Sequence, residues 1–384
     1  MDARTAEAVT RATPSVRADW TMLRPVLIYH LITRAMILAG LIVASALSGR
    51  TFPRVVTRWD GRWYAKLALH GYPAQLPVGP AGKIKTSTAG FFFLYPLLTK
   101  GFTAVGIPFW LGGMIINLVA STAAALIIVL VGREYLDRNA AAMLACLWTA
   151  FPVSAVLTTT YTEAVFTVFG AGCLLFVLRR RWLLAGLAAA LAGAVRSPGI
   201  VFAGAVALGA LMAIITRREW RSLIGAVIAP LGFLAAVAYI GWRTGRWDAW
   251  QITERDGWHA KLTFGRGWLS FLTASPSSPH GLPHLLTAWL AVALVVLAII
   301  AVALRPPVPI IGLIVAGCFL AFAFGGVEMD AAPRVMMSFF PVLAPLAILL
   351  ARWPTVIRWA ILGLAAVVAA VVGGYYFAYA PISL

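Results

Sequence analysis

Long apolar segments alternate with short polar ones from residue 25 to the C-terminus. Most are close to the ~20 residues that an α-helix needs to cross the hydrocarbon core of a bilayer. We therefore expect an all-α polytopic membrane protein, in which residues 1–24 form a tail and residues 25–384 form one transmembrane domain. The pattern predicts eleven transmembrane helices, at 25–48, 109–132, 140–157, 163–178, 182–195, 197–215, 222–242, 284–304, 308–324, 335–351 and 356–379.

Basic residues between these segments predict the orientation of the chain. Short loops rich in Lys and Arg stay on the cytoplasmic side, and such loops occur at 179–181, 217–221 and 352–358. The tail would then be cytoplasmic, and two long loops, 49–108 and 243–283, would be external. This alternation requires that "FFFLYPLL" (91–98) forms an interfacial or re-entrant helix. The alternative, a twelfth span, would send the loops at 179–181 and 217–221 outside.

Composition agrees with a membrane protein. The chain is 61% hydrophobic and 11% charged, whereas about 25% of residues are charged in a soluble domain. Its net charge of +18 lies mostly in loops, which favours membrane lipids and lipid phosphates over nucleic acid as partners. Cys146, Cys173 and Cys318 lie inside apolar segments without metal spacing, so we interpret them as small core residues. We expect the first segment to be an uncleaved span, with a signal peptide as the alternative.

The stretch "RWDGRWYAKLALHGYP" (58–73) follows the first apolar segment. The spacing predicts a helix over 58–69 that ends at the Gly and Pro of "HGYP". An amphipathic helix of this kind lies in the membrane interface, with tryptophans at headgroup depth. Its basic stripe would hold Arg58, Arg62 and Lys66, and its apolar stripe Trp59, Trp63 and Leu67.

Asp60 has no place in a simple membrane anchor, because its charge weakens attraction to anionic lipid. An ionisable residue at the membrane boundary is a candidate for a functional site. A carboxylate there can take a proton from a hydroxyl group, which is the work of a general base. Glu163, Glu328 and Asp330 are the next candidates for this role.

The same stretch resembles the first-loop signature of PIG-V-type mannosyltransferases, which belong to the GT-C superfamily of membrane glycosyltransferases. "AGFFFLYPLL", "FPVSAVLTTTYTEAVF" and "RRRWLLAGLAAALAGAVRSPG" resemble later motifs of that family, so the agreement runs from about residue 55 to 200. Beyond it, only "APRVMMSFFP" is similar. Leu94, Pro198 and Val335 depart from the family's pattern, as does the missing Pro before Tyr161, and these departures leave the acceptor open.

The resemblance implies a GT-C-like bundle that moves a mannosyl unit from a polyprenyl-phosphate sugar to a hydroxyl of a lipid-linked or envelope acceptor. It implies a single inverting displacement without cofactor or metal, with Asp60 as the base. It also implies a bacterial plasma-membrane protein whose site faces the extracytoplasmic side. The expected substrate-binding residues are Arg58, Trp59, Arg62, Trp63, Tyr64, Tyr95, Tyr161, Glu163, Arg196 and Arg334.

Several of these residues have simpler alternatives. Glu163 suits the first turn of a helix, where an acid favours the helix dipole. Arg196 stands at a span end, where an arginine can reach the interface without binding phosphate. Arg255 is a further candidate for phosphate, and the nearby Glu254, Asp256 and His259 are either metal ligands or parts of a solvated loop.

Two other classes of protein remain open at this point. A transporter or flippase would place ionisable residues in mid-membrane, whereas Arg34 is the only charge well inside a predicted span. A non-catalytic subunit of a glycosylation complex would not need Asp60.

Overall fold

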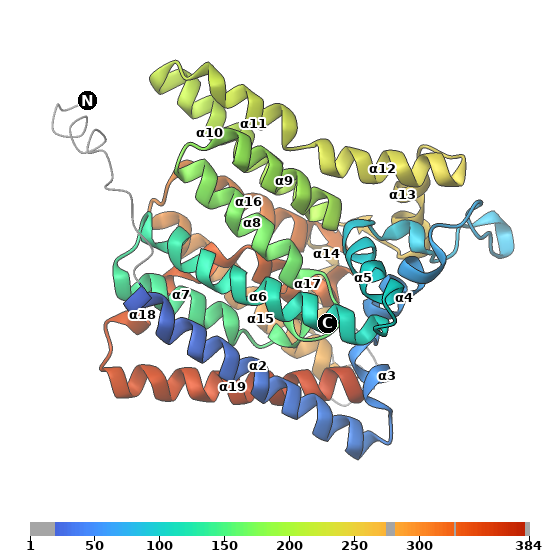
Figure 1. Ribbon diagram of the computed structural model, residues 1–384, viewed down its shortest axis with the longest axis horizontal. Coiled ribbons are helices and arrows are strands. Elements are labelled where there is room, and N and C mark those ends of the chain that lie inside the picture. Colours follow the sequence, from blue (N-terminus) through green and yellow to red (C-terminus); the bar gives the residue numbers. More distant parts are fainter. Residues whose placement is uncertain (1–19, 274–280, 326–327, 381–384) are drawn as a thin grey trace.

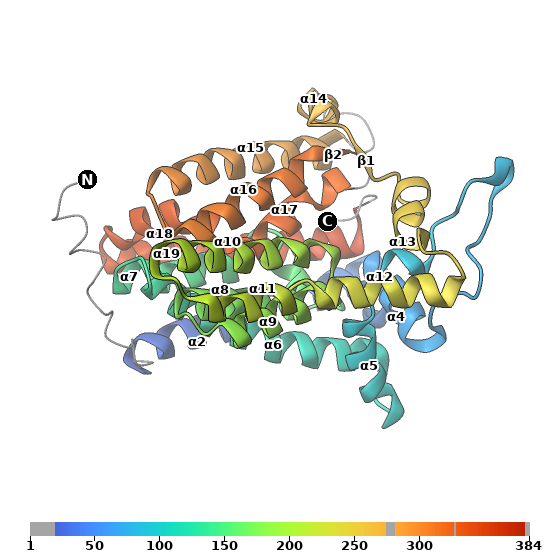
Figure 2. The same cartoon turned by 90° about the horizontal axis from the view of Figure 1, so that it is seen from above.

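The computed structural model describes residues 20–273, 281–325 and 328–380. Its long helices run side by side along the horizontal direction of Figure 1. Most of the short helices gather at one end of this bundle, at the right in Figures 1 and 2. The two strands of the described chain, β1 (Lys261–Leu262) and β2 (Phe324–Gly325), form one short antiparallel pair. The predicted all-α polytopic class is confirmed.

Six described segments are long and apolar enough to cross a membrane. A seventh is possible if the pair Asp330–Ser338 and Phe340–Ala351, which is bent by 89°, counts as one broken span. The predicted count of eleven is not confirmed. The six segments are Trp20–Ser48, Phe109–Arg133, Ser197–Arg217, Trp220–Thr244, His284–Ala303 and Thr355–Ala378.

The helices of these segments are α2 (Trp20–Ser48), α6 (Phe109–Arg133), α10 (Ile200–Arg217), α11 (Leu223–Ile228), α12 (Leu231–Thr244), α15 (Gly281–Ala303) and α19 (Thr355–Ala378). Shorter apolar helices stand between them: α7 (Arg138–Thr149), α8 (Glu163–Leu178), α9 (Trp182–Val195), α16 (Val308–Ala323) and α18 (Ala344–Ala351). Turns of 3-10 helix join several of them: η3 (Ser154–Leu157), η4 (Ser197–Gly199), η5 (Trp220–Ser222) and η7 (Phe340–Leu343). Packing joins helices that are distant in sequence, for example α2 with α19 and α10 with α16.

The predicted span 140–157 is instead a broken segment. α7 ends at Thr149, and η3 follows after a short turn. Arg34 of α2 explains why this break can be buried. Its guanidinium donates to the carbonyl oxygens of Thr149 at 2.6 Å and Ser154 at 2.7 Å. Carbonyls at a helix end need partners when water is absent, so Arg34 has a structural role.

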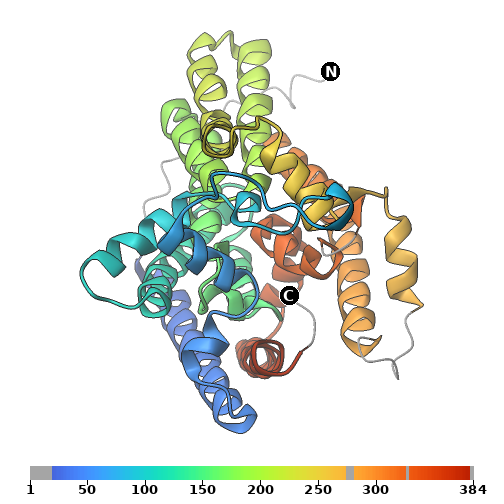
Figure 3. The ribbon, with the colours of Figure 1, turned by 90° about the vertical axis from the view of Figure 1, so that its right-hand side faces the viewer.

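The predicted external loop 49–108 contains three helices at one end of the bundle (Figure 3). These are α3 (Phe52–Val56), α4 (Asp60–His70) and α5 (Leu94–Ala104). A projecting segment with η1 (Pro80–Gly82) and η2 (Thr88–Gly90) connects α4 to α5. With 11 residues, α5 is shorter than the ~20 needed to span a bilayer, which agrees with an interfacial or re-entrant helix.

The predicted external loop 243–283 also contains short helices. It contains α13 (Ala249–Ile252), the π-helix η6 (Thr253–Gly257) and α14 (Arg266–Leu272). α17 (Glu328–Ser338) begins before the predicted span 335–351. Pro333 and Arg334 therefore lie inside a helix and not at its start.

The three cysteines are free, and Cys146 and Cys173 are fully buried. This confirms the interpretation as small core residues for Cys146 and Cys173, whereas Cys318 is only partly buried. Residues 1–19, most of the predicted tail, and residues 381–384 lie outside the described part of the chain.

Candidate active site

Asp60 is the first residue of α4, and the predicted helix therefore begins two residues too early. The cause is Trp59, whose φ of 56° is uncommon for a bulky residue and interrupts the helix there. Such backbone conformations persist where the surrounding structure enforces them, and they cluster at functional sites. Asp60 thus stands at a helix N-terminus, where the aligned peptide dipoles favour a carboxylate.

The end of α3 and the start of α4 are held against the turn that precedes α8. The backbone N–H and hydroxyl of Thr160 donate to the carbonyl oxygen of Val56 at 3.1 and 2.9 Å. The hydroxyls of Tyr64 and Thr162 are 3.2 Å apart. A Cβ on Gly61 would clash with Thr160 Oγ1, so only glycine allows this approach. These contacts bring Asp60 close to Glu163.

Two carboxylates and two guanidinium groups form one continuous cluster at this point. Arg334 Nη1 donates to Asp60 Oδ2 at 2.6 Å and lies 3.2 Å from Glu163 Oε1. Arg196 Nη1 donates to the same Glu163 oxygen. Glu163 is fully buried, and the side chain of Arg334 is only 6% exposed. Their charges balance, as buried charges require. We call Asp60, Glu163, Arg196 and Arg334 the charged tetrad.

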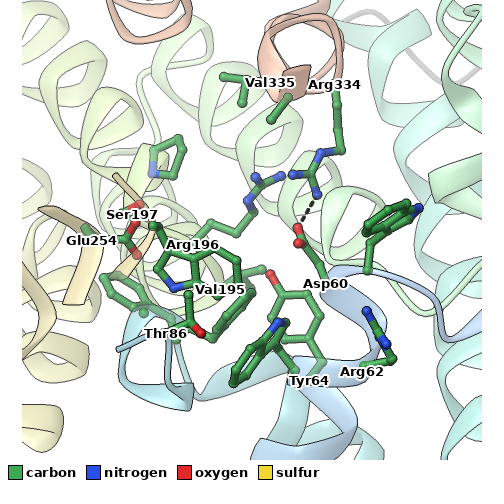
Figure 4. Close-up of a pocket in the computed structure, with 18 of the residues that line it drawn as sticks. Asp60, Arg62, Tyr64, Thr86, Val195, Arg196, Ser197, Glu254, Arg334 and Val335 are labelled. Carbon is green, nitrogen blue, oxygen red and sulfur yellow. Dashed lines mark hydrogen bonds and ion pairs between the residues drawn. The ribbon is translucent and has the colours of Figure 1, made fainter. Parts of the chain in front are cut away.

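Three members of the tetrad, Asp60, Arg196 and Arg334, line a cavity of about 500 Å³ (Figure 4). Figure 4 shows Arg334 above Asp60, with Arg62 and Tyr64 below. The cavity walls come from α4, α17, the 86–92 segment, the α9–α10 corner and the π-helix region. Seven predicted site residues line it: Trp59, Asp60, Arg62, Trp63, Tyr64, Arg196 and Arg334.

Arg334 therefore contacts Asp60, the predicted base, directly. Arg196 reaches the cluster through Glu163 and lines the same cavity. Their roles toward a lipid phosphate stay predictions.

Four predicted residues do not line the cavity. Arg58 donates to the carbonyl oxygens of Tyr376, Phe377 and Ala380 at the end of α19, so it is not part of a basic stripe on α4. Glu163, Tyr95 and Tyr161 are fully buried behind the wall.

Arg255 does not line the cavity either; it pairs with its neighbour Asp256 at 2.7 Å and is largely exposed.

The two tyrosines nearest Asp60 are neutral. Burial raises the pKa of the Tyr64 hydroxyl far above its ordinary value. Burial also raises the pKa of Tyr161, and the charge of Asp60 adds to this effect. A neutral phenol donates a hydrogen bond but is no base at physiological pH. The Tyr161 ring lies under Arg334, with the guanidinium carbon 5.1 Å from the ring centroid.

The cavity also has lining residues that sequence patterns did not assign to a substrate. Asp330 stands one helical turn before Arg334 on α17, and Glu254 and Trp258 come from the π-helix region. The sequence did place Asp330 and Glu254 at the predicted external face. The sequence did not show the tertiary packing that brings these two residues near α4. The side chain of Glu328, the other reserve candidate for the base, lies outside the described side chains.

Among the described residues, no group of three or more His, Cys, Asp and Glu side chains is arranged to hold a metal ion. The spacing of Glu254, Asp256 and His259 in sequence does not become such a group in space.

Comparison with known protein families gives no matching family. No curated protein matches the chain either.

Solved structures do show similarity. ArnT from Cupriavidus metallidurans, bound to undecaprenyl phosphate, has a TM-score of 0.47 and 16% identity, covering 86% of this chain and 62% of that one. The archaeal oligosaccharyltransferase AglB from Archaeoglobus fulgidus, in complex with an inhibitory peptide and a dolichol-phosphate, has a TM-score of 0.48 and 12% identity over 95% of this chain and 57% of that one. The Archaeoglobus fulgidus oligosaccharyltransferase tethered with an acceptor peptide scores 0.40 at 14% identity, over 91% and 56% of the two chains. The chain thus spans about three fifths of the length of these proteins. Its function is therefore inferred from its own site.

Proposed function

We propose that the protein is a membrane glycosyltransferase that moves a sugar from a polyprenyl phosphate to a hydroxyl group of a lipid-linked or envelope acceptor. The sequence resemblance described above makes mannose the expected sugar. One observation carries the proposal: three carboxylates, Asp60 among them, and three arginines line one cavity beside aromatic walls, at the end of a bundle of apolar helices. This reaction needs a base, cations for a leaving phosphate and an apolar path for a lipid.

The residues that line the cavity have different proposed roles in the sugar transfer. The ion pair engages Oδ2 of Asp60, and Oδ1 is the atom proposed to take the proton of the acceptor hydroxyl. The acceptor oxygen forms a bond to C1 of the sugar as the bond from C1 to the phosphate oxygen breaks. Displacement from one side inverts C1. The phosphate leaves with its negative charge, which an arginine can bind through two parallel hydrogen bonds.

Arg62 and Arg196 are the proposed phosphate ligands. Arg62 lines the cavity and is exposed. Arg196 lines it too, although Glu163 holds one of its nitrogens. Arg334 is engaged by two carboxylates, which favours a positioning role beside Asp60 over the phosphate role expected from sequence.

The orientation is part of the same proposal. The cavity lies at the end of the bundle formed by residues of the predicted loops 49–108 and 243–283. With the arginine-rich loops on the cytoplasmic side, this end is extracytoplasmic in a bacterial plasma membrane. Residues 25–384 then form one transmembrane unit behind a cytoplasmic tail.

A sugar-transfer assay tests the proposal directly. The purified chain in detergent receives a radiolabelled polyprenyl-phosphate mannose and a glycolipid extract, and labelled product is separated by chromatography. Asp60→Asn keeps the shape and removes the basicity. Loss of a positioned base slows such reactions about 10²–10⁴-fold, so this variant is expected to transfer almost no sugar. Asp248→Asn is the matched control, because Asp248 is an exposed carboxylate paired with Arg246.

The outcomes separate the competing classes. A flippase would move the labelled lipid across reconstituted vesicles without changing it covalently. If the protein is a non-catalytic subunit, the wild type and Asp60→Asn would give the same result in the transfer assay. If Asp60→Asn keeps more than about a tenth of the turnover, the barrier rises by less than about 1.4 kcal/mol, and Asp60 is not the base.

A further inference from the structure

The cavity has a second side that the transfer chemistry above leaves without a role. Figure 4 shows Glu254, Ser197 and Thr86 on the side away from Asp60 and Arg62. Glu254 belongs to the π-helix Thr253–Gly257. Such helices are rare and occur frequently at functional sites.

Two glycines fix this part of the wall. A Cβ on Gly90 would lie 2.7 Å from Trp258 Nε1 and 3.0 Å from Glu254 Oε1. A Cβ on Gly257 would lie 3.0 Å from the backbone nitrogen of Thr86. The π-helix region therefore rests directly on the segment before α5, and Glu254 is held in place at the cavity.

An aromatic surface adjoins Glu254. Trp63, Phe91 and Trp258 all line the cavity, with ring centroids 5.3 Å apart for Trp63 and Trp258 and 5.5 Å for Phe91 and Trp258. The face of an aromatic ring is negative, so it attracts the polarised C–H groups on one face of a sugar ring. Aromatic walls with a few placed polar groups are the usual form of a small-ligand site.

The charges of the side chains that line the cavity favour a ligand with a negative charge at one end only. The formal charges of the lining side chains cancel: Arg62, Arg196 and Arg334 against Asp60, Glu254 and Asp330. Oδ1 of Asp330 is buried and lies 3.6 Å from His284 Nε2, which is too long for a good hydrogen bond. A buried acceptor of this kind needs a donor at hydrogen-bond distance. Ionised phosphate cannot donate, whereas a hydroxyl group both donates and accepts.

We propose that this second side is a subsite for the ring of a neutral hexose, and that Glu254 selects the hexose through its hydroxyl groups. The proposal rests on the proposed transferase function, in which both substrates carry sugars. The same chemistry fits the sugar of the donor and the terminal sugar of the acceptor, and kinetics distinguishes the two.

Glu254→Gln tests this assignment in the full-length protein. A lost hydrogen bond to a charged group corresponds to about a tenfold to hundredfold loss in affinity. The KM of one substrate is expected to rise by that factor while kcat changes little. A rise for the donor assigns the subsite to the donor sugar, and a rise for the acceptor assigns it to the acceptor. Asp256→Asn is the control, because Asp256 stands on the same π-helix, pairs with Arg255 and does not line the cavity.

A binding measurement keeps this proposal separate from the transferase function. Saturation-transfer NMR with methyl α-mannoside and its monodeoxy analogues reports contact of each ring proton with the protein. The wild type is expected to prefer the intact sugar over at least one deoxy analogue, and Glu254→Gln is expected to lose that preference. If the wild type transfers no sugar but shows this pattern, the subsite stands and the transferase proposal fails. If Glu254→Gln matches the wild type in both KM values and in NMR, the subsite is wrong.

Discussion

Arg334 Nη1 lies 2.6 Å from Asp60 Oδ2, although 274 residues separate the two in sequence. The pair joins α17 to the first turn of α4 and continues through Glu163 to Arg196. Every member of the tetrad thereby depends on the others for its charge balance. This dependence makes the tetrad testable by substitution.

Arg334→Gln is expected to destabilise the protein and to abolish transfer. Removing one partner of a buried ion pair leaves the other charge uncompensated, at a cost of about 3–5 kcal/mol. Unfolding followed by tryptophan fluorescence in detergent measures this cost. The double variant Asp60→Asn, Arg334→Gln is expected to lose less unfolding free energy than the two single variants lose together, because both changes remove the same ion pair. Additive losses would show that the ion pair contributes nothing.

Glu163→Gln is expected to lower kcat through the two arginines that Glu163 holds. Glu163 is fully buried and does not line the cavity, so it positions other residues and does not touch substrate. Without its charge, Arg334 keeps only Asp60 as a carboxylate partner, and Arg196 loses the carboxylate that it pairs with. The pH profile of kcat is expected to move with the substitution, since the charge around the proposed base changes. A variant with lower stability but an unchanged pH profile would limit Glu163 to a structural role.

Gly61→Ala is expected to reduce both stability and transfer, although alanine is the better helix former by about 1 kcal/mol. The added Cβ would clash with Thr160 Oγ1 and push α4 away from the turn before α8. Gly101→Ala is the matched control, because Gly101 also lies in a helix, α5, and no atom stands within 4 Å of its Cβ position. Equal effects of the two substitutions would show that the close approach of α4 is not needed.

Cysteine labelling in intact cells tests the orientation. Lys85 and Arg180 are both exposed. They belong to segments at opposite ends of the bundle in Figure 2, the projecting segment before α5 and the connection from α8 to α9. A membrane-impermeant maleimide is expected to label Lys85→Cys and to spare Arg180→Cys. The natural cysteines are free, so each result is compared with the unsubstituted chain. The reverse pattern would place the cavity on the cytoplasmic side.

The hydrophobic pattern predicted the class of fold because membrane helices are set by local length and polarity. Every predicted apolar segment contains helix, although 140–157 and 335–351 are broken within the bundle. Pro152 and Pro341 mark these breaks in the sequence. The sequence does not show the distant partner of the freed carbonyls, which is Arg34 at the first break.

Sequence alone also singled out Asp60, Arg196 and Arg334 as candidates, because charges at the ends of apolar segments are conspicuous. Their arrangement was decided by tertiary structure. Helical spacing predicted that Arg58 lies beside Arg62, but the unusual backbone at Trp59 turns Arg58 toward the end of α19. Glu254 reaches the cavity only because glycines let its π-helix rest on the segment before α5. Helix periodicity is a local property of the chain, whereas these contacts depend on how distant segments pack against each other. A local sequence pattern therefore cannot predict them.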